Sequence, residues 1–110
     1  MLAYMYIIMY IALMGKNDTC SWDDPKRETN ITKHGFDFVS IHEVFDGRFT
    51  VTREDNRRDY GEKRYNMLTE FHGLIINVTF TPRAGRAHLI SVRPANRAER
   101  KVYDAKRKSL

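Results

Sequence analysis

The fold is decided by residues 89–103, LISVRPANRAERKVY, where a strand pattern runs directly into a helix pattern. Side chains alternate up to Arg93, so we expect Ile90 and Val92 on one face of the strand and the arginine on the other. Pro94 has no N–H to continue a central ladder, and we expect the strand to end before it. The pattern predicts an arginine held in place at the end of a buried strand.

The helix that follows has a clear start signal. Asn96 and Glu99 have the spacing of a capping box, which predicts a helix beginning immediately after the asparagine. Ala98, Val102 and Ala105 then form an apolar stripe that we expect to lie on the sheet, while the other faces are basic. A phosphodiester could bind where this cationic helix meets the strand arginine.

The rest of the chain predicts an α+β domain. Cap signals and apolar spacing indicate two helices, and alternation with turn residues indicates strands joined by short turns. The expected elements are a short strand ending at residues 21–23, helices over 26–34 and 37–45, a short strand over 49–52, a surface loop over 53–64, and strands over 65–71, 74–81 and 87–93. We therefore expect an antiparallel sheet of three or four strands, plus the short N-terminal strand, with two N-terminal helices and one C-terminal helix.

Length, charge and cysteine content limit the classes of protein. A chain of 110 residues forms one domain, and its net charge of +5 favours polyanionic partners. The single cysteine, Cys20, excludes an intramolecular disulfide and a cysteine-based zinc site. A reducing cytoplasm is the expected compartment.

Residues 1–14 are uncharged and apolar, but they are shorter than the roughly 20 residues that span a bilayer. They also lack the cationic start of a secretory signal. Three interpretations remain open: an extension outside the functional domain, an added helix or strand, or a membrane-associated segment. We place the extension at residues 1–19 and the domain at residues 20–110.

A series of short motifs between Trp22 and Tyr103 resembles the BrnT family, the ribonuclease toxins of type II toxin-antitoxin systems. The order and spacing of the motifs carry the resemblance, since each piece alone is common. The matching residues are Trp22-Asp23, Lys26, Asn30, Lys33-His34-Gly35, Phe38, Val44-Phe45, Arg57, Asp59-Tyr60-Gly61-Glu62, Arg64, Thr81, Arg83, Ile90-Ser91, Arg93, Ala95, Arg97, Glu99-Arg100 and Tyr103. Two features depart from the family pattern: Pro94, where a basic residue is common, and the apolar residues before Trp22.

The resemblance implies a compact RelE-like fold and an endoribonuclease whose RNA cleavage inhibits translation. It also implies neutralisation by a BrnA-like antitoxin with a ribbon-helix-helix part. Operator DNA is then a partner only through the antitoxin complex, and a membrane is not an expected partner.

Metal-independent RNA cleavage uses the 2′-hydroxyl of the substrate as nucleophile, so the protein must bind the phosphate and move protons. We expect no cofactor and no metal site. Arg64, Arg83 and Arg93 are the candidates for binding the phosphate, because the guanidinium fork fits phosphate oxygens. His34 and Glu62 are the candidates for proton transfer. As alternatives, Arg64 pairs with an acidic neighbour, Arg83 lies in a turn without function, His34 caps a helix, and Glu62 is solvated surface.

Further side chains are candidates for binding RNA outside the reacting phosphate. Aromatic rings stack on single-stranded bases, and cationic side chains bind the RNA backbone. These candidates are Lys33, Tyr60, Arg97, Arg100 and Tyr103. For the two tyrosines, packing in the core is the alternative.

Two other classes of function remain open on the sequence. The chain could be a non-catalytic nucleic-acid or protein-binding module on a toxin-like scaffold, which predicts salt-sensitive binding without RNA degradation. It could also be a membrane-associated small protein directed by residues 1–14.

Overall fold

The computed structural model describes residues 19–110. The predicted extension lies almost wholly outside this range. Eight elements follow one another: β1 (Cys20–Ser21), α2 (Asp24–His34), the 3-10 helix η2 (Phe38–Phe45), β2 (Val51–Glu54), β3 (Tyr65–Phe71), β4 (Leu74–Arg83), β5 (Arg86–Pro94) and α3 (Arg97–Lys108). The α+β class is confirmed. In the described part of the chain, no helix is long and apolar enough to cross a membrane.

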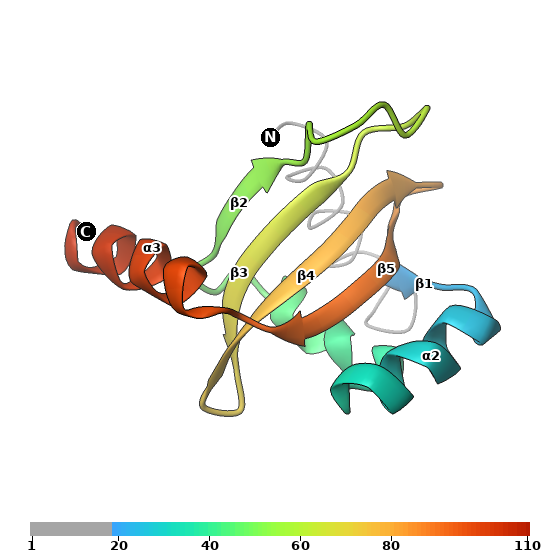
Figure 1. Ribbon diagram of the computed structural model, residues 1–110, viewed down its shortest axis with the longest axis horizontal. Coiled ribbons are helices and arrows are strands. Elements are labelled where there is room, and N and C mark those ends of the chain that lie inside the picture. Colours follow the sequence, from blue (N-terminus) through green and yellow to red (C-terminus); the bar gives the residue numbers. More distant parts are fainter. Residues whose placement is uncertain (1–18) are drawn as a thin grey trace.

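Five strands form one mixed sheet in the order β1-β5-β4-β3-β2. Strands β2 to β5 are antiparallel neighbours, and the two-residue β1 lies parallel to β5 (Figure 1). The strands β3 and β4 meet at His72-Gly73, between the predicted strands 65–71 and 74–81, and both residues have positive φ. The connection between the predicted strands 74–81 and 87–93 is shorter than expected, because β4 and β5 extend toward each other and are joined by Ala84 and Gly85 alone.

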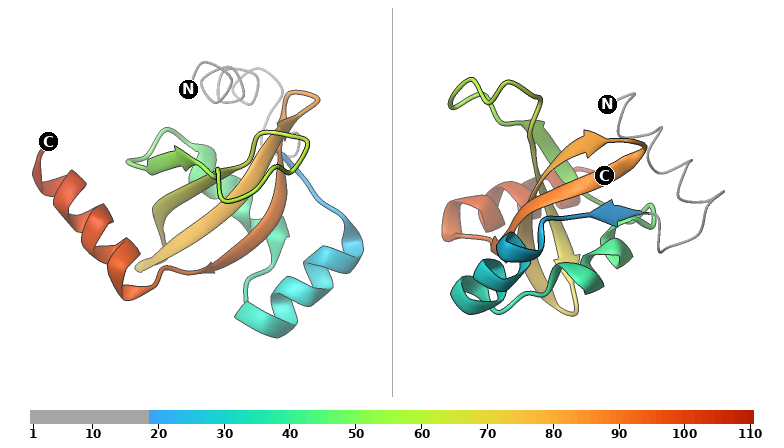
Figure 2. Two further views of the ribbon diagram at one scale, coloured as in Figure 1. Left: turned by 45° about the horizontal axis from the view of Figure 1, so that its top comes forward. Right: turned by 90° about the vertical axis from the view of Figure 1, so that its right-hand side faces the viewer.

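One face of the sheet carries the main core. Met67, Val78 and Phe80 are fully buried on this face, and the short helix η2 covers them with Phe38 and Phe45. The predicted second helix exists, but it has 3-10 rather than α geometry. Asp37 caps its start by accepting a hydrogen bond from the Val39 N–H at 3.0 Å. η2 and α3 lie on opposite faces of the sheet (Figure 2).

The helix α3 covers only part of the second face. Its capping box is present as predicted, between Asn96 and Glu99. The predicted apolar stripe is wrong, however, because Tyr103 is the side chain of α3 that packs, 3% exposed beside Leu68, whereas Val102 is 44% exposed. A single bulky aromatic anchors the helix, so its small residues face an open groove. No other helix or strand of residues 19–110 covers the remainder of this sheet face, which we call the uncovered face.

A β-bulge changes which side chains of β5 reach the uncovered face. Thr79 pairs with Ser91 while Phe80 pairs with Leu89, so Ile90 is the extra residue. The predicted alternation therefore breaks at this point. Ile90 and Ser91 both line hollows on the uncovered face.

Beyond the two residues paired with β1, the outer edge of β5 is completed by a side chain. Asn30 of α2 donates to the Val92 carbonyl and accepts from the Val92 N–H, both at 2.9 Å. The same amide also donates to the Phe36 carbonyl at 2.9 Å. Because Val92 turns its backbone groups outward, those of Pro94 point outward too. Pro94 can therefore end β5 without removing a hydrogen bond to β4, although we expected the strand to stop before it.

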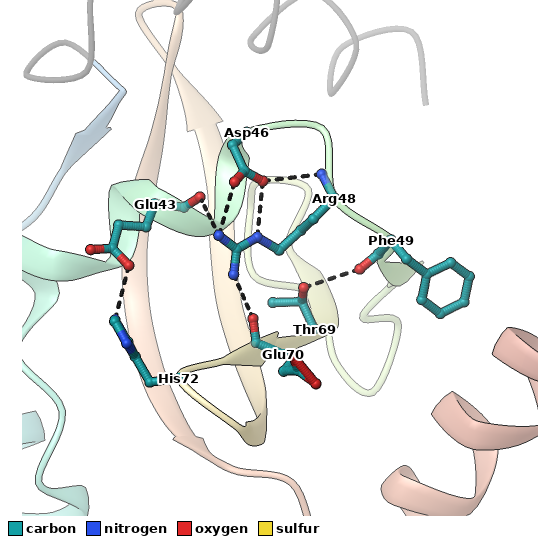
Figure 3. A network of polar contacts seen from close by, with 7 residues as sticks. All are labelled: Glu43, Asp46, Arg48, Phe49, Thr69, Glu70 and His72. Carbon is teal, nitrogen blue, oxygen red and sulfur yellow. Dashed lines mark hydrogen bonds and ion pairs between the residues drawn. The ribbon is translucent and has the colours of Figure 1, made fainter.

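Arg48 connects the C-terminal end of η2 to the sheet (Figure 3). Its guanidinium donates to the Glu70 carbonyl of β3 at 2.7 Å and to the Glu43 carbonyl of η2 at 3.1 Å. It also pairs with Asp46, whose carboxyl pKa falls to about 2 because Arg48 hydrogen-bonds to it. The next residue, Phe49, is held to β3 by a side chain, because its carbonyl accepts from the Thr69 hydroxyl at 3.1 Å, and β2 begins at Val51 rather than at residue 49.

We predict that Asn30→Ala lowers the free energy of unfolding by about 2–4 kcal/mol, because the buried N–H and C=O of Val92 lose their partners. Urea unfolding followed by circular dichroism measures this. Thr32→Ala, on an exposed position of the same helix, is the matched control and should unfold near wild type. Equal stability of the two variants would show that the Asn30 contacts do not support β5.

Candidate functional site

The uncovered face of the sheet forms a hollow of 580 Å³, which we call the arginine pocket. Its lining includes four arginines and three carboxylates. The lining residues are Arg53, Glu54, Asp55, Asn56, Arg57, Tyr60, Arg64, Asn66, Asn77, Thr79, Ile90, Ser91, Arg93 and Glu99. They come from four neighbouring strands, the loop after β2 and the first turn of α3. The pocket is therefore a sheet surface with a loop at one side and a helix start at the other.

Polar side chains form the floor of the arginine pocket, because side chains alternate between the two faces of the sheet along each strand. Asn77 and Thr79 lie between the buried Ile76, Val78 and Phe80 of β4, so they point to the opposite face. The Thr79 hydroxyl donates to the Asn66 side-chain oxygen at 2.7 Å across the strand pair. The floor is thus polar, internally hydrogen-bonded and held by the most central strands.

Arg93 lies at the side of the pocket next to α3 and forms a bidentate ion pair with Glu99. The two guanidinium nitrogens donate to the two carboxylate oxygens at 2.7 and 2.8 Å. Asn77 also donates to Glu99, at 2.8 Å, and so does the Asn96 N–H of the capping box, at 2.9 Å. The hydrogen bonds from Arg93 are the largest influence that lowers the Glu99 carboxyl pKa, to about 2. Glu99 therefore fixes the arginine on a rigid support.

A second ion pair builds the loop side of the pocket. Asp55, with its side chain 1% exposed, accepts from Arg57 at 2.9 and 2.7 Å and from the Tyr60 hydroxyl at 3.3 Å. Hydrogen bonding from Arg57 lowers the Asp55 carboxyl pKa far below its usual range despite burial. The Arg57 side chain stays 76% exposed. The buried carboxylate thus presents an accessible cation to the pocket.

Tyr60 and Arg64 form another wall of the arginine pocket. The Arg64 guanidinium carbon lies 4.2 Å from the centre of the Tyr60 ring, a cation–π contact. Glu62 lies 3.6 Å from Arg64 Nε and accepts a hydrogen bond from Arg83 at 3.1 Å. Arg83 therefore lies outside the arginine pocket and is connected to it through this carboxylate. Of the three predicted phosphate ligands, Arg64 and Arg93 share one hollow and Arg83 does not.

His34 and Lys33 lie in a neighbouring hollow of 350 Å³ beneath α2, which we call the histidine hollow. Gly35 ends that helix at φ 77°, as predicted, which leaves both side chains in the last helical turn. The histidine hollow shares Ile90 and Ser91 with the arginine pocket. The bulge in β5 therefore connects the two sites.

The three remaining candidates belong to α3 and lie outside the arginine pocket. Arg97 and Arg100 are exposed, and Arg100 donates to the Ala95 carbonyl at 3.0 Å. Tyr103 is buried with its ring centre 5.2 Å from that of Phe49, edge to face. Its ring packs in the small second core.

Residues 22–99 match the model of the family described as "Ribonuclease toxin, BrnT, of type II toxin-antitoxin system". The chain belongs to the BrnT family of ribonuclease toxins. No curated protein sequence matches the chain. The matched range includes every residue that lines the arginine pocket, and also the bulge at Ile90 that the two hollows share. It ends at Glu99, the carboxylate that holds Arg93.

The sequence did not indicate several residues that line the arginine pocket. Asp55, Arg57 and Asn77 were not candidates, and Glu99 was assigned only as a helix cap. One signal was present: Asn77 and Thr79 alternate with apolar residues in β4, which marks a polar sheet face. The pairing of Asp55 with Arg57 depends on loop geometry and has no such signal.

We predict that the free energy of unfolding depends less on pH in Glu99→Gln than in the wild type below pH 6. A carboxylate with a lowered pKa stabilises the fold fully above its unfolded value of 4.5, and this stabilisation is lost as pH falls through about 2. The wild type should therefore lose about 2–3 kcal/mol more than the variant between pH 6 and pH 2. Urea unfolding at several pH values measures the difference. Asp104→Asn, a change on an exposed position of the same helix, should keep the wild-type slope; an unchanged slope in Glu99→Gln would contradict the ion-pair assignment.

Proposed function

We propose that this chain is a metal-independent endoribonuclease in which the arginine pocket binds the scissile phosphate. The observation that carries the proposal is the convergence of Arg64 and Arg93 on one hollow, although they are far apart in the sequence. Arg57 adds a third, exposed guanidinium. Guanidinium groups bind phosphate oxygens in pairs and stay charged at every physiological pH, so they stabilise the extra negative charge that develops as the 2′-hydroxyl attacks.

The proposed roles follow from how firmly each arginine is held. Arg93 is fixed by Glu99 and acts on the reacting phosphate, because charge stabilisation requires donors that do not have to reorganise. Arg64 binds a phosphate oxygen beside Tyr60. Arg83 acts through Glu62, by holding the carboxylate that lies against Arg64.

Proton transfer is assigned to His34 and Glu62: one removes the proton of the attacking 2′-hydroxyl, and the other protonates the 5′-oxygen that leaves as its bond to phosphorus breaks. Imidazole exchanges protons near neutral pH, and His34 lies in the hollow next to the arginine pocket. Glu62 lies beside Arg64 and has its side chain 32% exposed. Glu99 is not suited to this role, because its pKa of about 2 and its four hydrogen bonds keep it from accepting a proton.

The two connected hollows support a path for a single RNA strand across the bulge of β5. One phosphate occupies the arginine pocket and a neighbouring one lies over the histidine hollow, near Lys33. Tyr60 offers a ring for base stacking, and Arg97 and Arg100 attract the strand from α3. Tyr103 contributes by holding α3 in place.

We further propose that cleavage inhibits translation in the cytoplasm, on a RelE-like scaffold, and that a BrnA-like ribbon-helix-helix antitoxin neutralises it. A type II toxin acts together with a protein antitoxin, and a basic RNA site is masked well by an acidic segment. Operator DNA is bound only through that complex. Copurification with the product of a small neighbouring reading frame tests this, and toxicity that no such product relieves would exclude it.

The second candidate is a non-catalytic binding module. One observation favours it: Arg57 and Arg93 are both already paired with carboxylates, which lowers their attraction for phosphate. This candidate predicts salt-sensitive RNA binding without degradation.

We predict that the purified chain cleaves RNA in the presence of EDTA and that Arg93→Ala reduces kcat by about 10²–10³-fold. Arg83→Ala, outside the pocket, should reduce it by about tenfold or less. A substrate carrying 2′-deoxyribose at the cleaved position should remain intact. Gel analysis of a labelled oligonucleotide measures all three.

Arg93→Lys serves as the folding control, because lysine keeps a cation beside Glu99 but cannot form a bidentate contact with a carboxylate or phosphate. It should unfold near wild type and still lose most activity. Full cleavage by either Arg93 variant would remove the central assignment, and binding without cleavage by the wild type would favour the binding module.

A further inference from the structure

The arginine pocket continues into a smaller groove between the sheet and α3. This groove, which we call the apolar slot, has a volume of 220 Å³. Its walls are four aliphatic side chains from three elements: Val51, Leu68, Ala98 and Val102. The slot exists because Tyr103 anchors α3 further along, which leaves the small residues of the helix standing off the sheet.

The slot and the pocket are parts of one surface. Arg53, Asn66, Asn77 and Glu99 line both. A ligand held by its phosphate on Arg93 therefore reaches the slot without leaving the protein surface. Any group attached close to that phosphate is brought to the aliphatic walls.

The polar rim of the slot points to the chemistry of its occupant. Asn77 is 4% exposed, and its Oδ1 is buried without a hydrogen-bond partner among residues 19–110, although its amide nitrogen binds Glu99. A buried acceptor of this kind is costly unless a donor meets it. The matching ligand has apolar faces for the walls and an N–H donor on its edge for Asn77.

We infer that the apolar slot is a nucleobase subsite, which takes a base next to the phosphate held in the arginine pocket and presents the Asn77 acceptor to an N–H on the edge of that base. This inference rests on the proposed function. A nucleobase has two apolar faces and a polar edge, whereas an aliphatic side chain from a protein partner would leave the Asn77 acceptor unsatisfied. The slot also lies below the size range of about 300–1,000 Å³ typical for extended ligands, which suits a single ring system.

The subsite makes binding depend on a base, which the arginine pocket alone does not, because phosphate contacts carry no base information. All four RNA bases carry an edge N–H: adenine and cytosine an amino group, uracil a ring N–H, and guanine both. Unsubstituted purine, which keeps the apolar faces but has no edge N–H, should therefore be the disfavoured occupant.

The test uses the full chain and a series of uncleavable 2′-deoxy-substituted oligonucleotides in which one base at a time is removed. Fluorescence anisotropy measures Kd. We expect removal of the base at one position to raise Kd by about tenfold, and removal elsewhere to have little effect. At that position, unsubstituted purine should bind more weakly than adenine.

Ala98→Phe fills the slot from the exposed face of α3, and Ala105→Phe is the matched control on the same helix, outside the slot. Ala98→Phe should bind the intact and the base-free oligonucleotides equally, while Ala105→Phe should behave as wild type. Circular dichroism melting checks that both variants fold. Val102→Glu, which places a charge in the slot, is a second variant with the same expected loss of base dependence.

Three outcomes would overturn the inference in distinguishable ways. If wild type cleaves RNA but no single base matters, the subsite fails and the proposed function stands. If no oligonucleotide binds and none is cleaved, both fail. If Ala98→Phe prevents neutralisation by the antitoxin while base dependence is absent, the slot binds a side chain of the protein partner instead.

Discussion

The ion pair between Arg93 and Glu99 is the interaction on which the rest of the site depends. The side chain of Glu99, in the first turn of α3, receives hydrogen bonds from Arg93 at the end of β5, from Asn77 on β4 and from the N–H of the N-cap residue Asn96, so one carboxylate joins two strands and a helix. It orients the arginine toward the open sheet face and caps the helix that borders this face. The arginine pocket and the apolar slot both end at this group. In the proposed enzyme, the substrate phosphate shares Arg93 with Glu99 and does not meet a free cation.

Local signals in the sequence predicted most elements of the fold. The capping box, the glycine after α2 and the His72-Gly73 turn are short-range patterns, and each lies where it was expected. The errors arose where tertiary contacts decide. The bulge at Ile90 reverses the facing of part of β5, and the anchoring of α3 by Tyr103 replaces the alanine and valine stripe. Neither depends on spacing within one element.

The candidate site was predicted in part for the same reason. The sequence indicated Arg64 and Arg93 as phosphate ligands because arginine chemistry is local, and both line the pocket. It did not predict that Glu62 would connect Arg83 to Arg64 from outside, since that requires the loop and the β4–β5 turn to meet. Likewise, the buried Asp55 carboxylate positions Arg57 only because the two side chains pair in the folded loop. Pairing partners, more than residue types, distinguish the site from a basic surface.

The most direct test of this account is a crystal structure of the chain bound to a short RNA whose cleavable 2′-hydroxyl is replaced by hydrogen. We expect one phosphate in the arginine pocket, with its oxygens within hydrogen-bonding distance of Arg93 and Arg64, and with Glu99 still in contact with Arg93. A phosphate bound only at the histidine hollow or along the exposed side of α3, with the arginine pocket left to solvent, would contradict it.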